Sequence, residues 1–263
     1  MKTYFDTLFS ERINDQLSAN GMQDRDLSPQ ELFGLDQFHL GGPEPISQLL
    51  QQVSFPASAS LLDLGSGLGG TSRLVAARTD ATILGIDQEA SFVAAADDLT
   101  KRCQLGDRIS FQTGDITDLD TGGKRYDGAF LAHVQMNIAD KQKLFSSIHR
   151  ALKPGAPLLM WEVFSDAPEK LVYPLPWALE SSESHLVSAD AAKALLQQAG
   201  FTLTEWYDKT EWAKAWGKNV IERGPSKGLS LPAALPRGKE RLANLFNAFL
   251  SESITVIQGV VHA

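Results

Sequence analysis

Residues Leu61–Gly70 read LLDLGSGLGG, and this stretch decides the fold. A short apolar run carries one acid, Asp63, and then breaks into a loop with glycines at 65, 67, 69 and 70. The sequence TSRLVAAR follows at once, with apolar residues at helical spacing. The pattern predicts a strand, a tight glycine-rich turn and a helix N-terminus, which together bring backbone N–H groups against a nucleotide-like ligand.

The spacing of these glycines fits two different ligands. Gly65, Gly67 and Gly70 satisfy the dinucleotide fingerprint G-x-G-x-x-G. Gly65, Gly67 and Gly69 satisfy the G-x-G-x-G of enzymes that bind S-adenosylmethionine (SAM). The same glycines could also serve only to pack a strand closely against a helix, so the rest of the chain has to decide.

Composition narrows the class of protein. The chain has 263 residues, of which 43% are hydrophobic, enough for an α/β core with extra elements. The formal net charge of −8 argues against nucleic acid or an anionic membrane surface as a partner. A single cysteine, Cys103, excludes an internal disulfide and a cysteine-rich metal site, and we expect no metal. The opening MKTYFDTLFSER lacks an apolar signal core, so we expect a cytoplasmic protein with no membrane partner.

Strands and helices alternate through the middle of the chain. Short apolar runs predict further strands at 83–87, 108–112, 126–132 and 157–164. The segments between them predict helices at 71–78, 91–103 and 141–152. The last of these helices stops at the breaker Lys153-Pro154-Gly155. This alternation predicts a parallel, doubly wound, Rossmann-like α/β sheet.

After the fifth strand the alternation is interrupted by residues 165–188, which are rich in proline and serine. It resumes with a helix at 189–199, the strand FTLTEWY, predicted helices over 209–249 and a last strand at 253–262. A final helix and strand after an insertion suit a sheet of about seven strands whose last strand is antiparallel. We therefore expect a helical lid segment over 1–55 and a ligand-binding domain over 56–263, with cap insertions at about 165–188 and 209–250.

Five motifs in this order carry a family resemblance: LLDLGSGLGG, ILGID, TGDITDLD, YDGAFLAHVQMNIADK and IHRALKPGA. Together they resemble the class I SAM-dependent methyltransferases, in the small-molecule branch with the quinone-biosynthesis and sarcosine/dimethylglycine methyltransferases. DQFHLGG, at Asp36–Gly42, is similar to an N-terminal motif found in part of that branch. The resemblance covers most of residues 36–201 and implies SAM as cofactor, S-adenosylhomocysteine (SAH) as product and a small-molecule acceptor.

The resemblance also assigns the cofactor-binding residues. It implies that the methionine portion lies over the glycine loop, with Asp63 near its amino end. Asp87 ends the second strand about 20 residues past the loop, where a carboxylate can accept ribose hydroxyls, although a solvated acid or helix cap would look the same. In the family an Asp at the place of Asp115 receives the adenine amino group, and the next residue packs on the ring. The expected set is Asp63, Gly65, Ser66, Gly67, Gly69, Asp87, Gln88, Asp115, Ile116 and Ala132.

Two histidines are candidates for chemistry. His133 follows the fourth strand, on the carboxyl side of the sheet where open α/β proteins bind ligands, and His39 lies in FHLGG. Either could take a proton from the acceptor, but His133 could equally be a hydrogen-bonded loop residue, and Gly41-Gly42-Pro43 only a turn. Asn137, Tyr173 and Trp177 are expected to line the acceptor site, with packing of the insertion as the alternative. No D/N-P-P-Y/F motif follows the fourth strand, which disfavours methylation of a base amino group.

Two other functions stay open. The first is a NAD(P)-dependent oxidoreductase, which the overlapping fingerprint allows, although no Y-x-x-x-K occurs in the expected region. The second is a SAM-binding protein without methyl transfer, either a regulator or an enzyme that uses the sulfonium for cyclisation. The sequence names neither the acceptor nor its methylated atom, and the insertions could form a lid or the interface of a homodimer.

Overall fold

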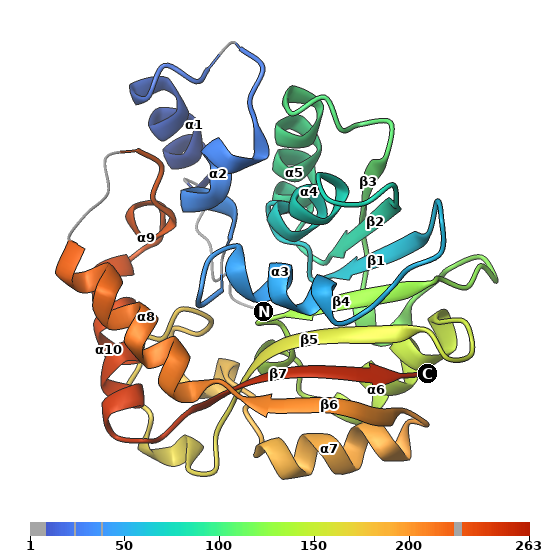
Figure 1. The fold of residues 1–263 in the computed structure, drawn as a ribbon. Coiled ribbons are helices and arrows are strands. Elements are labelled where there is room, and N and C mark those ends of the chain that lie inside the picture. Colours follow the sequence, from blue (N-terminus) through green and yellow to red (C-terminus); the bar gives the residue numbers. More distant parts are fainter. Residues whose placement is uncertain (1–8, 24, 38, 224–227) are drawn as a thin grey trace.

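A computed structural model describes residues 9–23, 25–37, 39–223 and 228–263. Its centre is a seven-stranded sheet in the order β3-β2-β1-β4-β5-β7-β6, in which β7 is antiparallel to both neighbours (Figure 1). This confirms the predicted doubly wound sheet and its antiparallel last strand. The strands are β1 Ser60–Leu64, β2 Thr82–Asp87, β3 Ile109–Thr113, β4 Gly128–Ala132, β5 Pro157–Phe164, β6 Thr202–Asp208 and β7 Thr255–His262.

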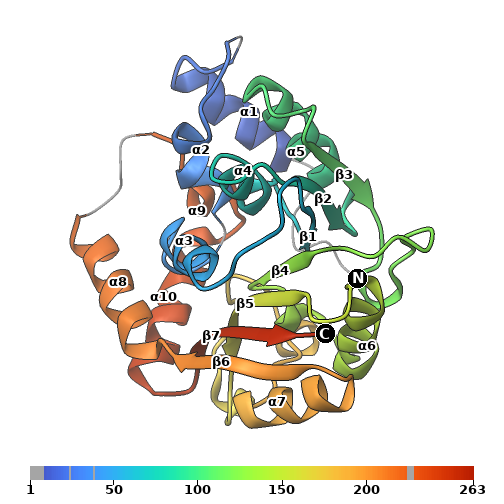
Figure 2. The ribbon, with the colours of Figure 1, turned by 45° about the vertical axis from the view of Figure 1, so that its right-hand side comes forward.

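Helices cover both faces of the sheet (Figure 2). Successive side chains of a strand point to opposite faces of the sheet. When helices cover both faces, the side chains on both faces must be apolar. Leu61 packs in a cluster with Leu49 of α3 and Val75 of α4, whereas Leu62 packs with Leu144 of α6. The helices are α1 Phe9–Ala19, α2 Pro29–Asp36, α3 Glu44–Gln51, α4 Gly70–Ala76, α5 Ala90–Arg102, α6 Lys141–Ala151, α7 Ala189–Gln198, α8 Thr210–Arg223, α9 Leu231–Ala234 and α10 Gly238–Leu250.

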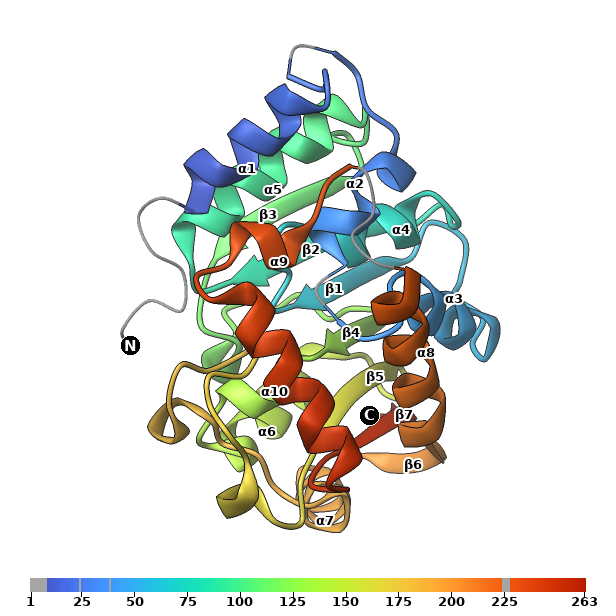
Figure 3. The ribbon, with the colours of Figure 1, turned by 90° about the vertical axis from the view of Figure 1, so that its left-hand side faces the viewer.

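The N-terminal segment and the second insertion form one cap. Figure 3 shows α1 and α2 beside α9, with α10 continuing from it, and α1 and α2 both contact α9. Arg12 Nε donates to the Ala234 carbonyl at 2.6 Å, and Gln16 exchanges two hydrogen bonds with the backbone of Ser230. A cluster of buried apolar side chains from α1, α2, α5 and 229–235 fills this cap. Residues 1–8, 24 and 38 of the predicted lid, and 224–227 of the insertion, lie outside the described residues.

The predicted element bounds differ from the structure in two informative places. The strand predicted from Tyr126 begins at Gly128, because Tyr126 makes only an isolated bridge to Leu152. The helix predicted over 71–78 spans Gly70–Ala76. Of the helices that the structure describes, none is long and apolar enough to cross a membrane.

Candidate active site

A cavity of about 340 Å³ lies at the carboxyl ends of β1, β2, β3 and β4. β1 pairs with β2 on one side and with β4 on the other, so the order of the sheet reverses at this point. Open α/β sheets bind ligands at such switch points. The cavity is lined by the glycine loop, by the ends of β2 and β3, by the loop after β4, and by the first insertion. A smaller cavity of about 80 Å³ continues behind the glycine loop toward the N-terminal segment.

The structure brings most of the predicted site residues to these two cavities. Gly65 and Gly67 line both, and a third predicted residue, His133, does so as well. The larger cavity adds Asp87, Gln88, Asp115, Ile116, Asn137 and Trp177, and the smaller one adds His39, Ser66 and Ala132. Three predicted residues, Asp63, Gly69 and Tyr173, line neither cavity.

The glycine loop is built by left-handed backbone and close packing. Gly65 has φ +73°, and a Cβ there would lie 2.6 Å from Val134 Cγ2, so only glycine lets the loop after β4 approach. Gly67 has φ +51° and open space where its Cβ would be. Its N–H donates to Asp87 Oδ2 at 2.9 Å, while Asp87 Oδ1 accepts from Glu89 N. Burial raises the pKa of Asp87, and these backbone N–H groups oppose that shift.

Asp63 is turned away from the cavity. Its carboxylate accepts hydrogen bonds from Ser72 Oγ at 2.6 Å and Ser72 N at 3.0 Å, which ties β1 to the first turn of α4. Burial raises the pKa of Asp63 to about 6. Gly69 is the N-cap of α4, where a Cβ would lie 2.6 Å from the Phe111 ring. Tyr173 packs partly buried against the main core. The three residues make these structural contacts, and their predicted ligand contacts stay predictions.

An acid and an apolar side chain stand next to each other at the end of β3. Asp115 is exposed at the rim, and its Oδ1 accepts from Thr117 N at 2.8 Å. This hydrogen bond lowers the pKa of Asp115. Ile116 is buried at the start of a short 3₁₀ helix and lines the cavity. Such a pair suits a planar heterocycle with a donor on its edge.

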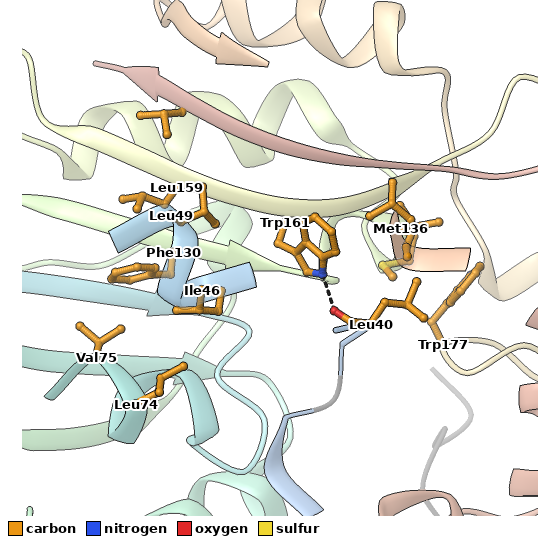
Figure 4. Close-up of a cluster of buried hydrophobic side chains, with 14 of the residues drawn as sticks. Leu40, Ile46, Leu49, Leu74, Val75, Phe130, Met136, Leu159, Trp161 and Trp177 are labelled. Carbon is orange, nitrogen blue, oxygen red and sulfur yellow. Dashed lines mark hydrogen bonds between the residues drawn. The ribbon is translucent and has the colours of Figure 1, made fainter. Parts of the chain in front are cut away.

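The two candidate histidines meet against one tryptophan. His133 stacks on Trp161 with ring centroids 6.2 Å apart, and the His39 ring approaches His133 edge-on at 6.0 Å. Trp161 Nε1 donates to the Leu40 carbonyl at 2.8 Å, which fixes the residue beside His39 (Figure 4). The Nε2 atoms of both histidines are buried and have no hydrogen-bond partner among the described residues.

Burial keeps both imidazoles neutral. It lowers the pKa of His39 to about 4, and it lowers the pKa of His133 well below its ordinary value, with His39 adding to the effect. His133 also has φ +54°, an uncommon backbone conformation for a non-glycine residue. A strained residue with an unpartnered buried nitrogen, at the edge of a cavity, is typical of a functional position. Neutral rings can accept a proton or a hydrogen bond from a ligand.

Two buried polar residues that support the loop after β4 were not predicted from the sequence. Glu162 is fully buried on β5, and its carboxylate accepts from Val134 N at 3.0 Å and from Gln135 N at 3.3 Å. Burial raises the pKa of Glu162 to about 8. Lys141 is buried at the start of α6, and burial lowers its pKa to about 8. A charged residue inside the apolar run PLLMWEVF was the signal that could have found Glu162.

A buried ion pair joins the N-terminal segment to the glycine loop. Arg73 Nη2 lies 2.7 Å from Asp36 Oδ2, and both side chains are at most 1% exposed. Arg73 also donates to Thr100 Oγ1 at 2.8 Å and to the Leu68 carbonyl. Asp36 lines the smaller cavity, so its link to α4 holds the N-terminal segment beside the glycine loop. Among the described residues no group of three or more His, Cys, Asp or Glu could hold a metal ion.

Comparison with known sequences finds methyltransferases. A family model described as a methyltransferase domain matches residues 61–155. The chain is 31% identical to O-methyltransferase cnsE of Penicillium expansum over 70% of its own length, and 24% identical to phosphoethanolamine N-methyltransferase 1 of Arabidopsis thaliana over 80%. It spans 66% and 41% of the lengths of these two relatives.

Solved structures share the fold at low sequence identity. Phosphoethanolamine N-methyltransferase 2 of Haemonchus contortus, with SAH bound, has a TM-score of 0.71 at 17% identity, covering 97% of this chain and 60% of that one. Geranyl diphosphate C-methyltransferase of Streptomyces coelicolor, also with SAH, has a TM-score of 0.67 at 14% identity, covering 97% and 98%. The [4+2]-cyclase SpnF has a TM-score of 0.65 at 19% identity, covering 84% and 80%.

Proposed function

Because the chain belongs to the class I SAM-dependent methyltransferases, we propose that it transfers a methyl group from SAM to a small molecule. One observation carries the proposal: a single cavity is lined on one side by the glycine loop and the ends of β2 and β3, and on the other by the loop after β4 and the first insertion. Methyl transfer is an in-line displacement, so both reactants must share one enclosed space. The cavity provides that space.

The first side, called here the cofactor half, consists of residues 65–67, 87–89 and 114–116. The open space at Gly67 admits a ligand against bare backbone, and Asp87 keeps a carboxylate at the cavity. Asp115 and Ile116 offer a hydrogen-bond acceptor and an apolar surface. We assign the methionine part of SAM to the loop, its ribose to Asp87 and its adenine to Asp115 and Ile116. When bound there, SAM supplies an electrophilic methyl group on a sulfonium.

The second side, called here the acceptor half, consists of residues 134–138 and 176–185. Met136, Ile138, Pro176 and Trp177 give it apolar surface, whereas Asn137, Ser182, Glu183 and His185 supply polar groups. The cavity lining contains no Lys or Arg among the described residues; it contains the carboxylate of Glu183 in the acceptor half and those of Asp87, Glu89 and Asp115 in the adjoining cofactor half. An anionic group would be repelled here. We therefore propose an acceptor without phosphate or carboxylate, unlike the phosphorylated ligands named for two of the similar proteins.

The histidine pair is proposed to handle the acceptor's proton. His133 borders both cavities, and its neutral ring can accept a hydrogen bond from an acceptor hydroxyl or amine and then take its proton. His39 lies edge-on behind it and can stabilise one orientation of that ring. The two residues would then align the nucleophile while the cap excludes water.

The oxidoreductase alternative loses its support. The dinucleotide-binding fold has a parallel sheet in the order 3-2-1-4-5-6, whereas here the antiparallel β7 lies between β5 and β6. The cyclase SpnF shows that this fold also occurs in an enzyme named for cyclisation. A cytoplasmic location and a homodimer stay predictions of the sequence, to be tested by cell fractionation and by light scattering.

Calorimetry followed by product analysis tests the proposal. We expect SAM and SAH to bind with dissociation constants in the micromolar range, about −8 kcal/mol, and NADH not to bind. Mass spectrometry of small-molecule pools incubated with protein and SAM should then show products heavier by one methylene unit, together with SAH. Binding of NADH without SAM would overturn the assignment, and SAM binding with a rearranged but unmethylated product would indicate a cyclase.

A further inference from the structure

Lys141 bridges two segments that are far apart in the chain. Its ammonium Nζ donates to the carbonyls of Gln135 at 2.7 Å, Ile138 at 2.5 Å and His185 at 2.6 Å. Gln135 and Ile138 belong to the loop after β4, whereas His185 belongs to the first insertion. An ammonium has three donors, so all of them are used on backbone acceptors. Lys141 itself lines neither cavity.

The same two segments form the acceptor half, and one further hydrogen bond joins them. His185 N donates to the Met136 carbonyl at 2.8 Å. Met136 and Trp177 also belong to one hydrophobic cluster, in which Figure 4 shows them near each other. On its other side, the loop is held by the Glu162 carboxylate through Val134 and Gln135. The acceptor half is therefore fixed by buried polar groups behind it.

We propose that Lys141 is a positioning residue that couples the loop after β4 to the first insertion and so sets the shape of the acceptor half. This rests on the proposed function, because it assigns the two segments to the acceptor. A buried ammonium is costly unless its hydrogen bonds are made, and three carbonyls from two segments meet that need only while both segments stay in place. Lys141 thus stabilises one arrangement of the acceptor half.

Two titratable groups of the described residues interact electrostatically with Lys141. They are the carboxylate of Glu162 on β5 and the imidazole of His185 in the first insertion. Burial lowers the pKa of Lys141 to about 8. Loss of its proton would remove the charge and one of the three donors that hold the two segments together.

Hydrogen exchange with SAH bound tests the proposal. In Lys141→Met, the amides of 133–138 and of 177–186 should both exchange at least about tenfold faster, because the free energy of local opening falls by about 1.4 kcal/mol. The exchange of amides 65–69 and 114–118 should stay unchanged. The SAH dissociation constant should stay within about twofold. Lys141→Gln keeps two donors and should show a smaller increase. The control is Lys143→Met, because Lys143 is exposed two residues along the same helix.

The order of the two variants separates positioning from packing. If Lys141 only fills space, the apolar Met should be milder than Gln, and that order would overturn the proposal. Unchanged exchange in both segments would do the same, even with SAH bound, whereas failure of the parent protein to bind SAH would count against the proposed function instead. Should Lys141→Met not fold, Lys141→Gln decides: exchange in both segments should rise together above that of the parent and of Lys143→Met, and unchanged exchange contradicts the coupling.

Discussion

The cofactor half and the acceptor half of the cavity are held in place in different ways. In the cofactor half the side-chain hydrogen bonds join nearer positions: Asp115 accepts from Thr117, and Asp87 accepts from Glu89 and from Gly67, 20 positions earlier. In the acceptor half they are distant: Glu162 holds residues 27 and 28 positions earlier, and Lys141 holds one 44 positions later. A substitution behind the acceptor half should therefore change the acceptor site and leave the cofactor site intact.

The N-terminal segment is tied to α4 by one buried ion pair. Asp36 and Arg73 lie 2.7 Å apart with almost no exposure, so removing one partner leaves the other charge buried and unpaired. We expect Asp36→Ala to lower the free energy of unfolding by about 3–5 kcal/mol. Urea denaturation measures this. The matched control is Asp97→Ala, which removes an exposed pair with Lys101 and should cost less than about 1 kcal/mol. Equal losses in the two variants would mean that the pair does not fix the lid.

His133, which borders the acceptor half, tests whether the chemistry takes place there. Because its φ is +54°, His133→Asn is the suitable variant, since Asn tolerates this backbone conformation and Ala does not. With the acceptor found by product analysis, kcat should fall about 100-fold, while SAH affinity changes less than threefold. His262→Asn, at the far end of β7, should have the parent rate. An unchanged kcat in His133→Asn would leave alignment alone as the source of rate.

The same histidine gives the pH profile a definite direction. Burial lowers the pKa of both His133 and His39, so the parent's rate should be flat between pH 6 and 8 and fall only in more acidic solution. The sign for stability agrees: unfolded histidines bind protons that the folded rings refuse, so stability from these groups declines as the pH falls below about 6.5. An acid limb of kcat centred near pH 6.5 would place the base elsewhere.

Replacing Asp87 tests the cofactor half instead of the acceptor half. A carboxylate that accepts two ribose hydroxyls makes charge-assisted hydrogen bonds worth about 1.5–3 kcal/mol each, so Asp87→Ala should weaken SAH by at least about tenfold. Asp87→Asn should be milder because it keeps an acceptor. Trp177→Phe, in the acceptor half, should leave the SAH dissociation constant unchanged. Calorimetry that finds parent-like binding in Asp87→Ala would remove this residue from the cofactor site.

Some features of the fold and the site were predictable from the sequence, and others were not. The seven-stranded sheet was predictable because its strands are apolar runs bounded by turns, and Asp87 and Asp115 were placed at the cavity because Asp87 ends β2 and Asp115 comes two residues after β3. Glu162 and Lys141 were missed, because the backbone N–H groups that Glu162 bonds and the His185 carbonyl that Lys141 bonds are brought near only by the fold. Asp63 stays a predicted cofactor residue: an acid before a glycine loop can face the ligand or the next helix, and here its carboxylate accepts two hydrogen bonds from Ser72.

The two halves touch at the glycine loop, and substitutions in this loop should have the smallest effect on stability. Gly67 has left-handed backbone but free space, so Gly67→Ala should cost only about 1 kcal/mol of stability, from the backbone alone. Gly65→Ala should cost at least about 1 kcal/mol more, because its Cβ would lie 2.6 Å from Val134 Cγ2. Val134→Ala removes the two methyl groups at 2.6 and 2.7 Å and leaves only the Cβ at 3.2 Å, so in its background the excess cost of Gly65→Ala over Gly67→Ala should shrink to about 0.5 kcal/mol. Urea denaturation of Gly65→Ala and Gly67→Ala, each in the parent and in the Val134→Ala background, measures the cost of the contact with the valine side chain. An excess that persists without the valine side chain would mean that Gly65 is required by its own loop, and that the halves are independent there.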